Sequence, residues 1–433
     1  RHNLKIITVI DLDGKMTTEA LEVAGLYPKQ AREKVAKILL EKGAITKVDE
    51  SYRNNLLVDY KDEQPIEPLP LPNWFLKMEK LSKMATKSIE AGEVKFYSPR
   101  WKKEILRWLK DIHDWPISRQ IVFGIRIPVW YSTKENPDLR ITFLDKNGIS
   151  HDGKIGVLLG HYDIKTIREG LQKLISPIDA KYVVSRSTPG NEYIQETDTF
   201  DTWFSSGQWP LVTLKYPNSP DFQEFFPTSF LDSMWDIIFF WVARMIMLSL
   251  YLTKKVPFKE VYFHGAITDE KGQKMSKSRG NVINPMDFVE KYGADALRMG
   301  ILVGGNTLAR FTALSEDKVR GYRNFANKIW NMARFVEVTK SELNSKESKT
   351  APPDFSTLLL SPSELKNLRD SKSISSEDIK ILEDTADLAK KVTEKLEKYR
   401  IADAGNMIYQ FMWHNLADVF IEQVKSRKNM DDQ

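Results

Sequence analysis

The chain has 433 residues, of which 42% are hydrophobic and 28% charged, and its net charge is +5. This composition provides enough apolar material for two or three packed domains and excludes wholesale disorder, while the mild basic excess permits an anionic partner such as RNA without arguing for one. Because the sequence contains no cysteine, disulfides and thiolate metal sites are excluded, and we expect a reducing, cytoplasmic compartment.

Residues 1–65 combine an expected strand, LKIITVI, with a helical stretch, KQAREKVAKILLEKG, in which Gly43 suits the C-cap. The first letters, RHNLKIITVIDLDG, include no initiator Met and look like the middle of a domain. We therefore expect that an N-terminal part is missing. The prolines of EQPIEPLPLPNW predict a boundary after this segment.

The next region shows the pattern of an α/β domain with a parallel sheet. Two helical patterns lie within residues 74–113, and residues 132–200 alternate short strands with turns, as an irregular insertion does. A strongly apolar helix at 236–252 is followed by a strand, VYFHGAI, and strand–helix–strand order is what a parallel sheet requires. The apolar run contains Arg244 and is shorter than the ~18 residues of a membrane span, so we expect a buried helix.

From residue 310 onward the pattern is helical. SEDKVRGYRNFANKIWNMARFVEV begins with a serine cap, and SEDIKILEDTADLAKKVTEKLEKYR carries apolar residues at spacings of three and four. Between them, residues 340–378 are rich in Ser, Lys and Pro and read as a solvated connection. The sequence therefore predicts an all-α helical bundle after the α/β region.

A cationic stretch, DEKGQKMSKSRGN at residues 269–281, is the main chemical feature. Most charge runs are solvated surface, but here small hydrogen-bonding residues alternate with the lysines, which suits a loop that closes over a polyanion. The sequence contains no Gly-x-x-x-x-Gly-Lys-Ser/Thr loop, no usable Gly-x-Gly-x-x-Gly and no His-Glu-x-x-His, and its six histidines lack ligand spacing. A phosphate-binding role therefore falls to this loop.

The segment KMSKS, Lys274 to Ser278, resembles the ATP-binding loop of class I aminoacyl-tRNA synthetases, whose catalytic domain is a Rossmann-like parallel fold. HGAITDEKGQKMSKSRGNVINPMDFVEKYGADALR is similar to the valyl, isoleucyl and leucyl branch, and FDTWFSSGQWP favours valyl over isoleucyl members. ISRQIVFGIRIPVWY is similar to the segment that returns from the editing insertion. NFANKIWNMARF and IYQFMWHNLADVFIE resemble anticodon-binding helices.

This resemblance implies three domains: the tail of the editing insertion at 1–65, a catalytic nucleotide-binding domain at 66–309 and an incomplete anticodon-binding domain at 310–433. The implied reaction activates valine with ATP to valyl-adenylate and then transfers valine to tRNA(Val). Lys274 and Lys277 would neutralise the departing pyrophosphate as the loop closes. Met275, Ser276 and Ser278 would complete the ATP-binding loop.

The resemblance also assigns residues outside the loop. Asp236 and His264 would contact the nucleotide, although Asp236 also fits an N-cap and His264 a structural histidine. The family usually has Gly-Tyr before this aspartate, where this chain has Met234-Trp235. Trp203 and Ile237 would line the valine pocket, and each taken alone also fits a plain core residue.

The family's His-x-Gly-His motif is missing, since LLGHYD at 158–163 lacks the first histidine. We therefore expect a fragment, or one piece of a split enzyme, that is inactive alone and needs its N-terminal part. A non-catalytic tRNA-binding module is the alternative, but it would have no use for KMSKSRGN. Mg²⁺ should arrive with ATP. No zinc is expected, because His151 and His161 alone cannot complete a four-ligand shell.

Overall fold

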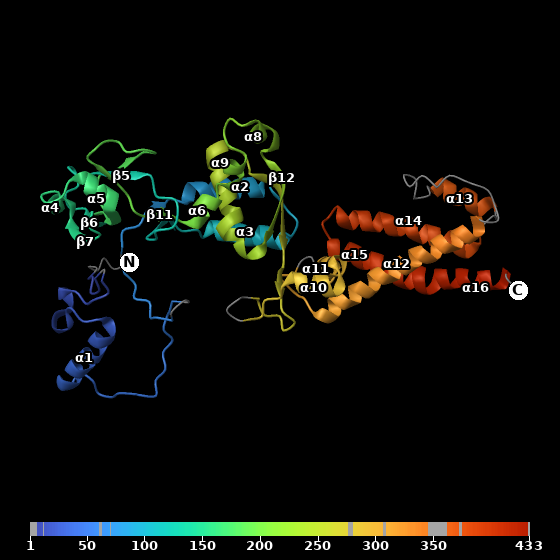
Figure 1. Cartoon of the computed structure of the whole chain (residues 1–433), viewed down its shortest axis with the longest axis horizontal. Helices are drawn as coiled ribbons and strands as arrows, with labels where there is room; N and C mark the ends of the chain where they lie inside the picture. The colour runs from blue at the N-terminus through green and yellow to red at the C-terminus, as the bar shows by residue number, and fades with distance from the viewer. Residues whose placement is uncertain are drawn as a thin grey trace. The chain divides into compact units, whose positions relative to one another are not determined.

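The computed structural model describes residues 7–11, 13–59, 63–69, 71–275, 280–305, 309–344, 362–371 and 375–431. The chain forms two compact units, each built from separate stretches of sequence (Figure 1). Unit 1 comprises Arg1–Leu76 and Pro116–Asp201, and unit 2 comprises Lys77–Trp115 and Thr202–Gln433. The domain limits expected at 65 and 309 stay predictions, because compactness does not define function.

Unit 1 contains small antiparallel sheets, with strand orders β10–β5–β9, β7–β6–β8 and β11–β4. Its elements are η1 (Thr18–Val23), α1 (Pro28–Glu41), β1 (Phe75–Leu76), β4 (Ser118–Arg119), β5 (Val129–Ser132), β6 (Arg140–Leu144), β7 (Ser150–Lys154), α4 (Ile155–Leu158), α5 (Ile164–Gly170), β8 (Leu171–Ile175), β9 (Val183–Val184), β10 (Tyr193–Gln195) and β11 (Thr199–Phe200). A short strand, β3 (Trp115–Pro116), lies at the boundary of the units.

The core of unit 1 follows from the alternation on β6, where Ile141 and Phe143 point inward and pack with Ile155 and Ile167. The opening segment agrees in part with expectation. The predicted helix forms as α1, with Gly43 at φ +65° just beyond it. The predicted strand does not form within its described residues, 7–10; among these, only Ile10 pairs, in an isolated bridge.

Unit 2 is built on a parallel sheet ordered β12–β13–β2, with β12 (Thr228–Met234), β13 (Phe258–His264) and β2 (Lys95–Phe96). In register, Met234 lies opposite His264, so the two longer strands end together. A second parallel pair joins β14 (Ala266–Thr268) to β15 (Phe311–Ala313). The predicted parallel α/β arrangement is confirmed.

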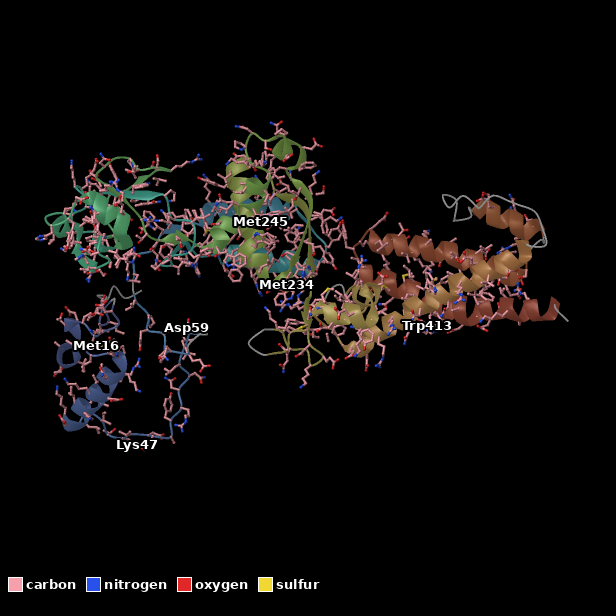
Figure 2. All side chains as sticks on the ribbon, in the orientation of Figure 1. Met16, Lys47, Asp59, Met234, Met245 and Trp413 are labelled. Carbon is pink, nitrogen blue, oxygen red and sulfur yellow. The ribbon has the colours of Figure 1, made fainter. Side chains whose placement is uncertain are left out.

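The crossover from β12 to β13 runs through η2 (Trp235–Ile237), the π-helix η3 (Ile238–Val242) and α9 (Ala243–Thr253). This continuous helix has 19 residues and is long and apolar enough to cross a membrane by length and composition, so the length argument made from the sequence was wrong. Its burial supports a core helix instead, because every residue of Ala243–Leu250 is buried. Figure 2 labels Met245 of this helix. The helix packs against α2 (Glu79–Glu90).

The remaining elements of unit 2 are helices. They are α3 (Pro99–Lys110), α6 (Thr202–Ser206), α7 (Trp209–Thr213), α8 (Pro220–Phe225), α10 (Pro285–Tyr292), α11 (Ala294–Leu302), α12 (Glu316–Asn344), α13 (Pro362–Ser371), α14 (Ser376–Leu396), α15 (Ile401–Gln410), the π-helix η6 (Phe411–Ile421) and α16 (Glu422–Asp431). The predicted serine cap is present, since Ser315 Oγ accepts from Lys318 N at 3.3 Å. The connection expected at 340–378 is wrong in part, because α12 extends into it and α13 forms within it.

Candidate functional site

Three residues predicted from the sequence lie at the carboxyl ends of the parallel strands. Asp236 follows β12 by two residues, and His264 is the last residue of β13. Lys274 forms an isolated bridge with Thr268, at the end of β14. In open parallel sheets, ligands bind outside this edge. The fold therefore brings these residues to the edge where a nucleotide is expected.

Lys274 and Asp236 are close enough to form an ion pair, with Nζ 3.6 Å from Oδ2. The other carboxylate oxygen of Asp236, Oδ1, is buried and has no hydrogen-bond partner within the described part of the chain. A buried acceptor left without a donor costs about 1–3 kcal/mol, so this atom is suited to accept a hydrogen bond from a ligand. Asp236 is not the N-cap, because the cap position of η2 is Met234.

His264 Nδ1 lies 2.9 and 3.0 Å from the two carboxylate oxygens of Asp232. The hydrogen bond to Asp232 raises the pKa of His264 above its ordinary value, opposed by desolvation and aided by the charges of Asp232 and Asp236. The imidazolium form is thus favoured at the strand edge. Asp232 was not predicted, although its place four residues before Asp236 on the same strand end could have identified it.

The base of the lysine loop is held by Asp269 and Asn281, two further residues that the sequence reading missed. Asp269 Oδ1 accepts from the backbone N–H groups of Lys271 at 3.1 Å and Gln273 at 2.7 Å. Its Oδ2 accepts from Asn281 Nδ2 at 3.0 Å, and Asn281 Nδ2 also lies 3.3 Å from the carbonyl oxygen of Lys274. Asn281 therefore joins the two ends of the loop, through Asp269 and the backbone of Lys274.

Met275 is the last residue of the described range 71–275, and the predicted residues Ser276, Lys277 and Ser278 lie outside the described residues. The aspartate of DEKG was the available signal for the base, because Asp commonly bonds to the backbone two residues onward in a turn.

A close backbone approach also shapes this edge. A Cβ on Gly265 would lie 2.6 Å from the carbonyl oxygen of Ala309, so only glycine fits between β13 and β14. The neighbouring carbonyl of Arg310 accepts from Trp235 Nε1 at 2.8 Å, and the Arg310 guanidinium lies 4.8 Å from the Trp235 ring centroid. These two contacts with Arg310 hold Trp235, the residue that directly precedes Asp236.

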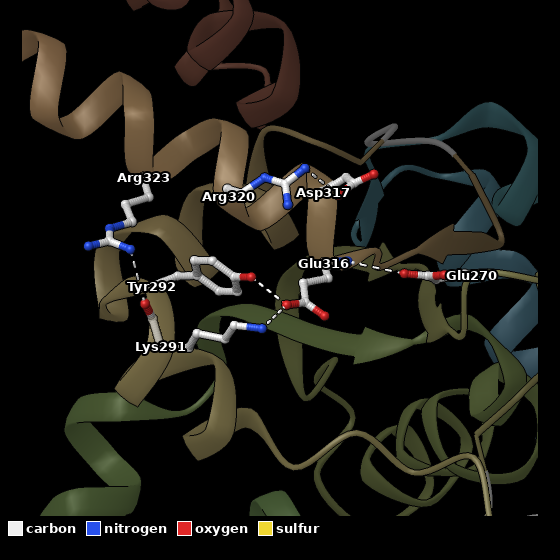
Figure 3. A network of polar contacts seen from close by, with 7 residues as sticks. All are labelled: Glu270, Lys291, Tyr292, Glu316, Asp317, Arg320 and Arg323. Atoms are coloured by element: carbon white, nitrogen blue, oxygen red, sulfur yellow. Dashed lines mark hydrogen bonds and ion pairs between the residues drawn. The ribbon is translucent and has the colours of Figure 1, made fainter.

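The loop is also connected to the first turn of α12 (Figure 3). Glu270 Oε1 accepts from the backbone N–H of Glu316 at 3.2 Å. The Glu316 carboxylate in turn accepts from Lys291 Nζ and from the Tyr292 hydroxyl, both at the end of α10. Arg323 donates to the backbone carbonyl of Lys291 at 3.4 Å. Chain segments before and after the lysine loop therefore meet at one helix end.

Trp203 and Ile237 lie in unit 2, and both are partly buried. Trp203, on α6, stacks on Phe240 with ring centroids 5.7 Å apart. Ile237 is the last residue of η2, directly after Asp236. Their roles in a side-chain pocket stay predictions.

Unit 1 contains a carboxylate in a different setting. Glu196 is 4% exposed. Its Oε2 accepts from Tyr131 OH at 2.9 Å and Trp74 Nε1 at 3.1 Å. Its Oε1 accepts from the backbone N–H groups of Thr197 and Asp198. Burial and the charge of Glu196 raise the pKa of Asp198. This cluster borders a cavity of about 950 Å³ within unit 1.

Two family models match the sequence. The model "tRNA synthetases class I (I, L, M and V)" matches residues 47–310, and "Anticodon-binding domain of tRNA ligase" matches residues 378–433. The second match covers α14 to α16, which agrees with the helical end expected from the sequence.

Similar proteins include a valine–tRNA ligase of Pelagibacter ubique, 35% identical over 437 aligned residues, and one of Streptococcus thermophilus, 34% identical over 436. Each alignment covers 100% of this chain but 43% of the relative, so the chain spans less than half the length of these proteins.

Among solved structures, Mycobacterium tuberculosis methionyl-tRNA synthetase in complex with methionyl-adenylate matches 82% of this chain and 54% of that one, with a TM-score of 0.52 at 15% identity. This likeness supports the fold alone. The model that matches residues 47–310 covers more than half of the sequence. The chain therefore belongs to the family of class I tRNA synthetases (I, L, M and V).

Proposed function

We propose that the complete protein is a valine–tRNA ligase, which converts valine and ATP to valyl-adenylate and pyrophosphate and then transfers valine to tRNA(Val). The observation that carries the proposal is the pairing of Lys274 with Asp236 at the ends of the parallel strands, in a chain that aligns along its whole length with valine–tRNA ligases. ATP, with Mg²⁺, is the substrate that this edge would hold.

Each residue has a role that its surroundings support. The Asp236 Oδ1 atom, buried without a partner in the described structure, would accept a hydrogen bond from a nucleotide hydroxyl. Lys274, 65% exposed at the side chain, is free to leave Asp236 for the phosphates. There, with Lys277, it would stabilise charge that develops on pyrophosphate as the α-phosphate is attacked. Asp269 and Asn281 would keep Lys274 at the strand edge.

Trp203 and Ile237 would bound the valine side chain, Trp203 as a wall and Ile237 as a limit on size. The helical end of unit 2 would hold the anticodon region of tRNA(Val). The chain spans 43% of the length of the Pelagibacter ubique relative, and we propose that a separate N-terminal part would supply the opposite side of the nucleotide crevice.

The test is valine-dependent pyrophosphate exchange. These 433 residues alone should show no exchange. A mixture with a separately expressed N-terminal part from the same genome should restore exchange, because the two parts would bury one shared core. Restored exchange with valine and not with isoleucine supports the proposal. Exchange by the chain alone would contradict the need for a partner, and a mixture that binds tRNA but activates no amino acid would favour a non-catalytic module.

A further inference from the structure

A groove of about 1,030 Å³ lies between α2 and α3, within unit 2 and outside the site described above. Cationic side chains dominate its polar lining: Lys83 and Lys87 from α2, and Arg100, Lys103, Arg107 and Lys110 from α3. Only three acids, Glu79, Glu90 and Glu104, line the same groove. The groove therefore has an excess of positive charge.

The spacing of these residues places them on one face of each helix. The four cations of α3 recur at intervals of three, four and three residues, and the two of α2 are four apart. The apolar face of α3, with Trp101, Ile105 and Leu109, is buried. The cations thus form two stripes that border one groove.

Two of the acids are already engaged. Glu79 pairs with Lys83 at 2.6 Å, and Glu104 pairs with Arg100 at 3.1 Å and with Arg310 at 3.0 Å. The remaining cations, Lys87, Lys103, Arg107 and Lys110, have no acidic partner in the described ranges of the chain. Most of the groove's positive charge is therefore available to a ligand.

This arrangement is unfavourable for the isolated helix. Like charges three or four residues apart destabilise a helix by roughly 0.2–0.5 kcal/mol a pair. The helix dipole favours Arg107 and Lys110, which lie in the last turn, but it gives no such benefit to Lys103 in the middle of α3. An anionic partner in the groove would remove the repulsion.

We propose that the groove binds the phosphate backbone of RNA, as a contact for tRNA additional to the helical end of the chain; this partner rests on the proposed function. The α3 stripe, from Arg100 to Lys110, is ~15 Å long at the α-helical rise. This length is enough to contact more than one phosphate of a nucleic-acid backbone. Contacts of Lys and Arg with phosphates fix position without reading sequence. A lipid surface is disfavoured because the apolar face of α3 is buried and cannot insert.

The test uses the 433-residue chain and a tRNA transcript, with the dissociation constant measured across a salt series. The double variant Lys103→Gln/Arg107→Gln should bind more weakly at low salt by about tenfold. The plot of log Kd against log salt concentration should become less steep, with a slope smaller by roughly 1.4–1.8, because two phosphate contacts are lost. The matched control is Lys80→Gln/Lys102→Gln, which also removes two positive charges from α2 and α3 but outside the groove, and it should leave the slope within error. Circular dichroism and thermal unfolding of both variants verify that the overall helix content and stability are unchanged.

Equal slopes for the double variant and the control would contradict the proposal that the groove binds RNA. Failure of the chain to bind the transcript at any salt concentration would also contradict it. Displacement of the transcript by polyglutamate as readily as by unlabelled RNA would show an acidic peptide to be the ligand and would also overturn it. Pyrophosphate exchange needs no tRNA, so its absence in the completed enzyme would contradict the proposed function and leave a groove-dependent salt slope standing.

Discussion

Two carboxylates, one in each unit, occupy opposite environments. Glu196 in unit 1 is 4% exposed, and both of its oxygens accept hydrogen bonds from the surrounding fold. Asp236 in unit 2 has a side chain that is 29% exposed, with one oxygen 3.6 Å from Lys274 and the other buried and without a partner in the described structure. The fold supplies hydrogen-bond donors to both oxygens of Glu196 but none to the Oδ1 atom of Asp236 within the described structure.

The difference separates structure from recognition. A buried polar network that is fully satisfied fixes one arrangement of its surroundings. A carboxylate oxygen that the fold leaves without a donor is stabilised only when something else supplies one. Substitutions at Glu196 should therefore change stability, and substitutions around Asp236 should change what the protein binds.

The largest effect is expected at Lys274. In the completed enzyme, Lys274→Ala should slow valine-dependent pyrophosphate exchange by roughly 10²–10³, the loss typical of one preorganised donor. The free energy of unfolding should change little, because the Lys274 side chain is 65% exposed. Lys271→Ala, in the same turn, is the matched control. Equal exchange rates for the two variants would contradict the proposed role of Lys274 and would indicate that the loop is an ordinary solvated surface loop.

Glu196→Ala should lower the free energy of unfolding by about 2–4 kcal/mol, because it leaves the buried donors of Trp74, Tyr131 and the backbone without an acceptor. Urea denaturation followed by tryptophan fluorescence measures the loss. Glu196→Gln, which retains an acceptor oxygen, should lose less. Asp236→Asn, in the same assay, should stay within ~0.5 kcal/mol of wild type. A larger loss of unfolding free energy for Asp236→Asn would mean that Asp236, like Glu196, serves mainly to stabilise the fold.

Trp203→Ala should relax specificity in the completed enzyme. A hydrophobic pocket rejects one extra methylene by only about 1–3 kcal/mol, a magnitude established on related synthetases. We expect a higher KM for valine and a smaller ratio of valine to isoleucine exchange. An enzyme that loses stability with an unchanged ratio would identify Trp203, stacked on Phe240, as a core residue.

The smallest effect is a pH dependence from His264 and Asp232. Because pairing raises the pKa of His264 above its ordinary value of 6.5, its stabilisation is fully present below that pH and is lost as the pH rises through the folded value. The difference in free energy of unfolding between wild type and Asp232→Asn should therefore shrink as the pH rises above 6.5. It should stay below ~1 kcal/mol, because both side chains are about half exposed.

His113→Gln is the control for this measurement, since His113 is exposed and has no carboxylate partner in the described part of the chain. A pH-independent difference at Asp232 would mean that His264 is not charged at the strand edge.

Periodic features of the sequence predicted much of the fold. The apolar run before VYFHGAI and the three- and four-residue spacings after residue 310 correspond to the crossover helix and the helical end. Periodicity assigned no residue to the candidate site. The resemblance assigned Asp236, His264 and Lys274 to one site, and the structure places all three at the carboxyl ends of the parallel strands. Other contacts between distant segments were not predicted, because periodicity carries no information on which strand ends meet. The partnership of Asp269 with Asn281 and the stacking of Arg310 on Trp235 are of that kind.

The way in which the first turn of α12 is held has a mechanical consequence. This helix has 29 residues and is thus ~43 Å long at the α-helical rise. A tilt of about 2° at its first turn would displace its far end by ~1.5 Å, so the helix acts as a lever arm whose fulcrum is Glu316. At that fulcrum the Glu316 carboxylate pairs with Lys291, and these two ionic groups are about half exposed to water. Dissolved ions screen such groups, so the angular stiffness of the lever should decrease as ionic strength rises.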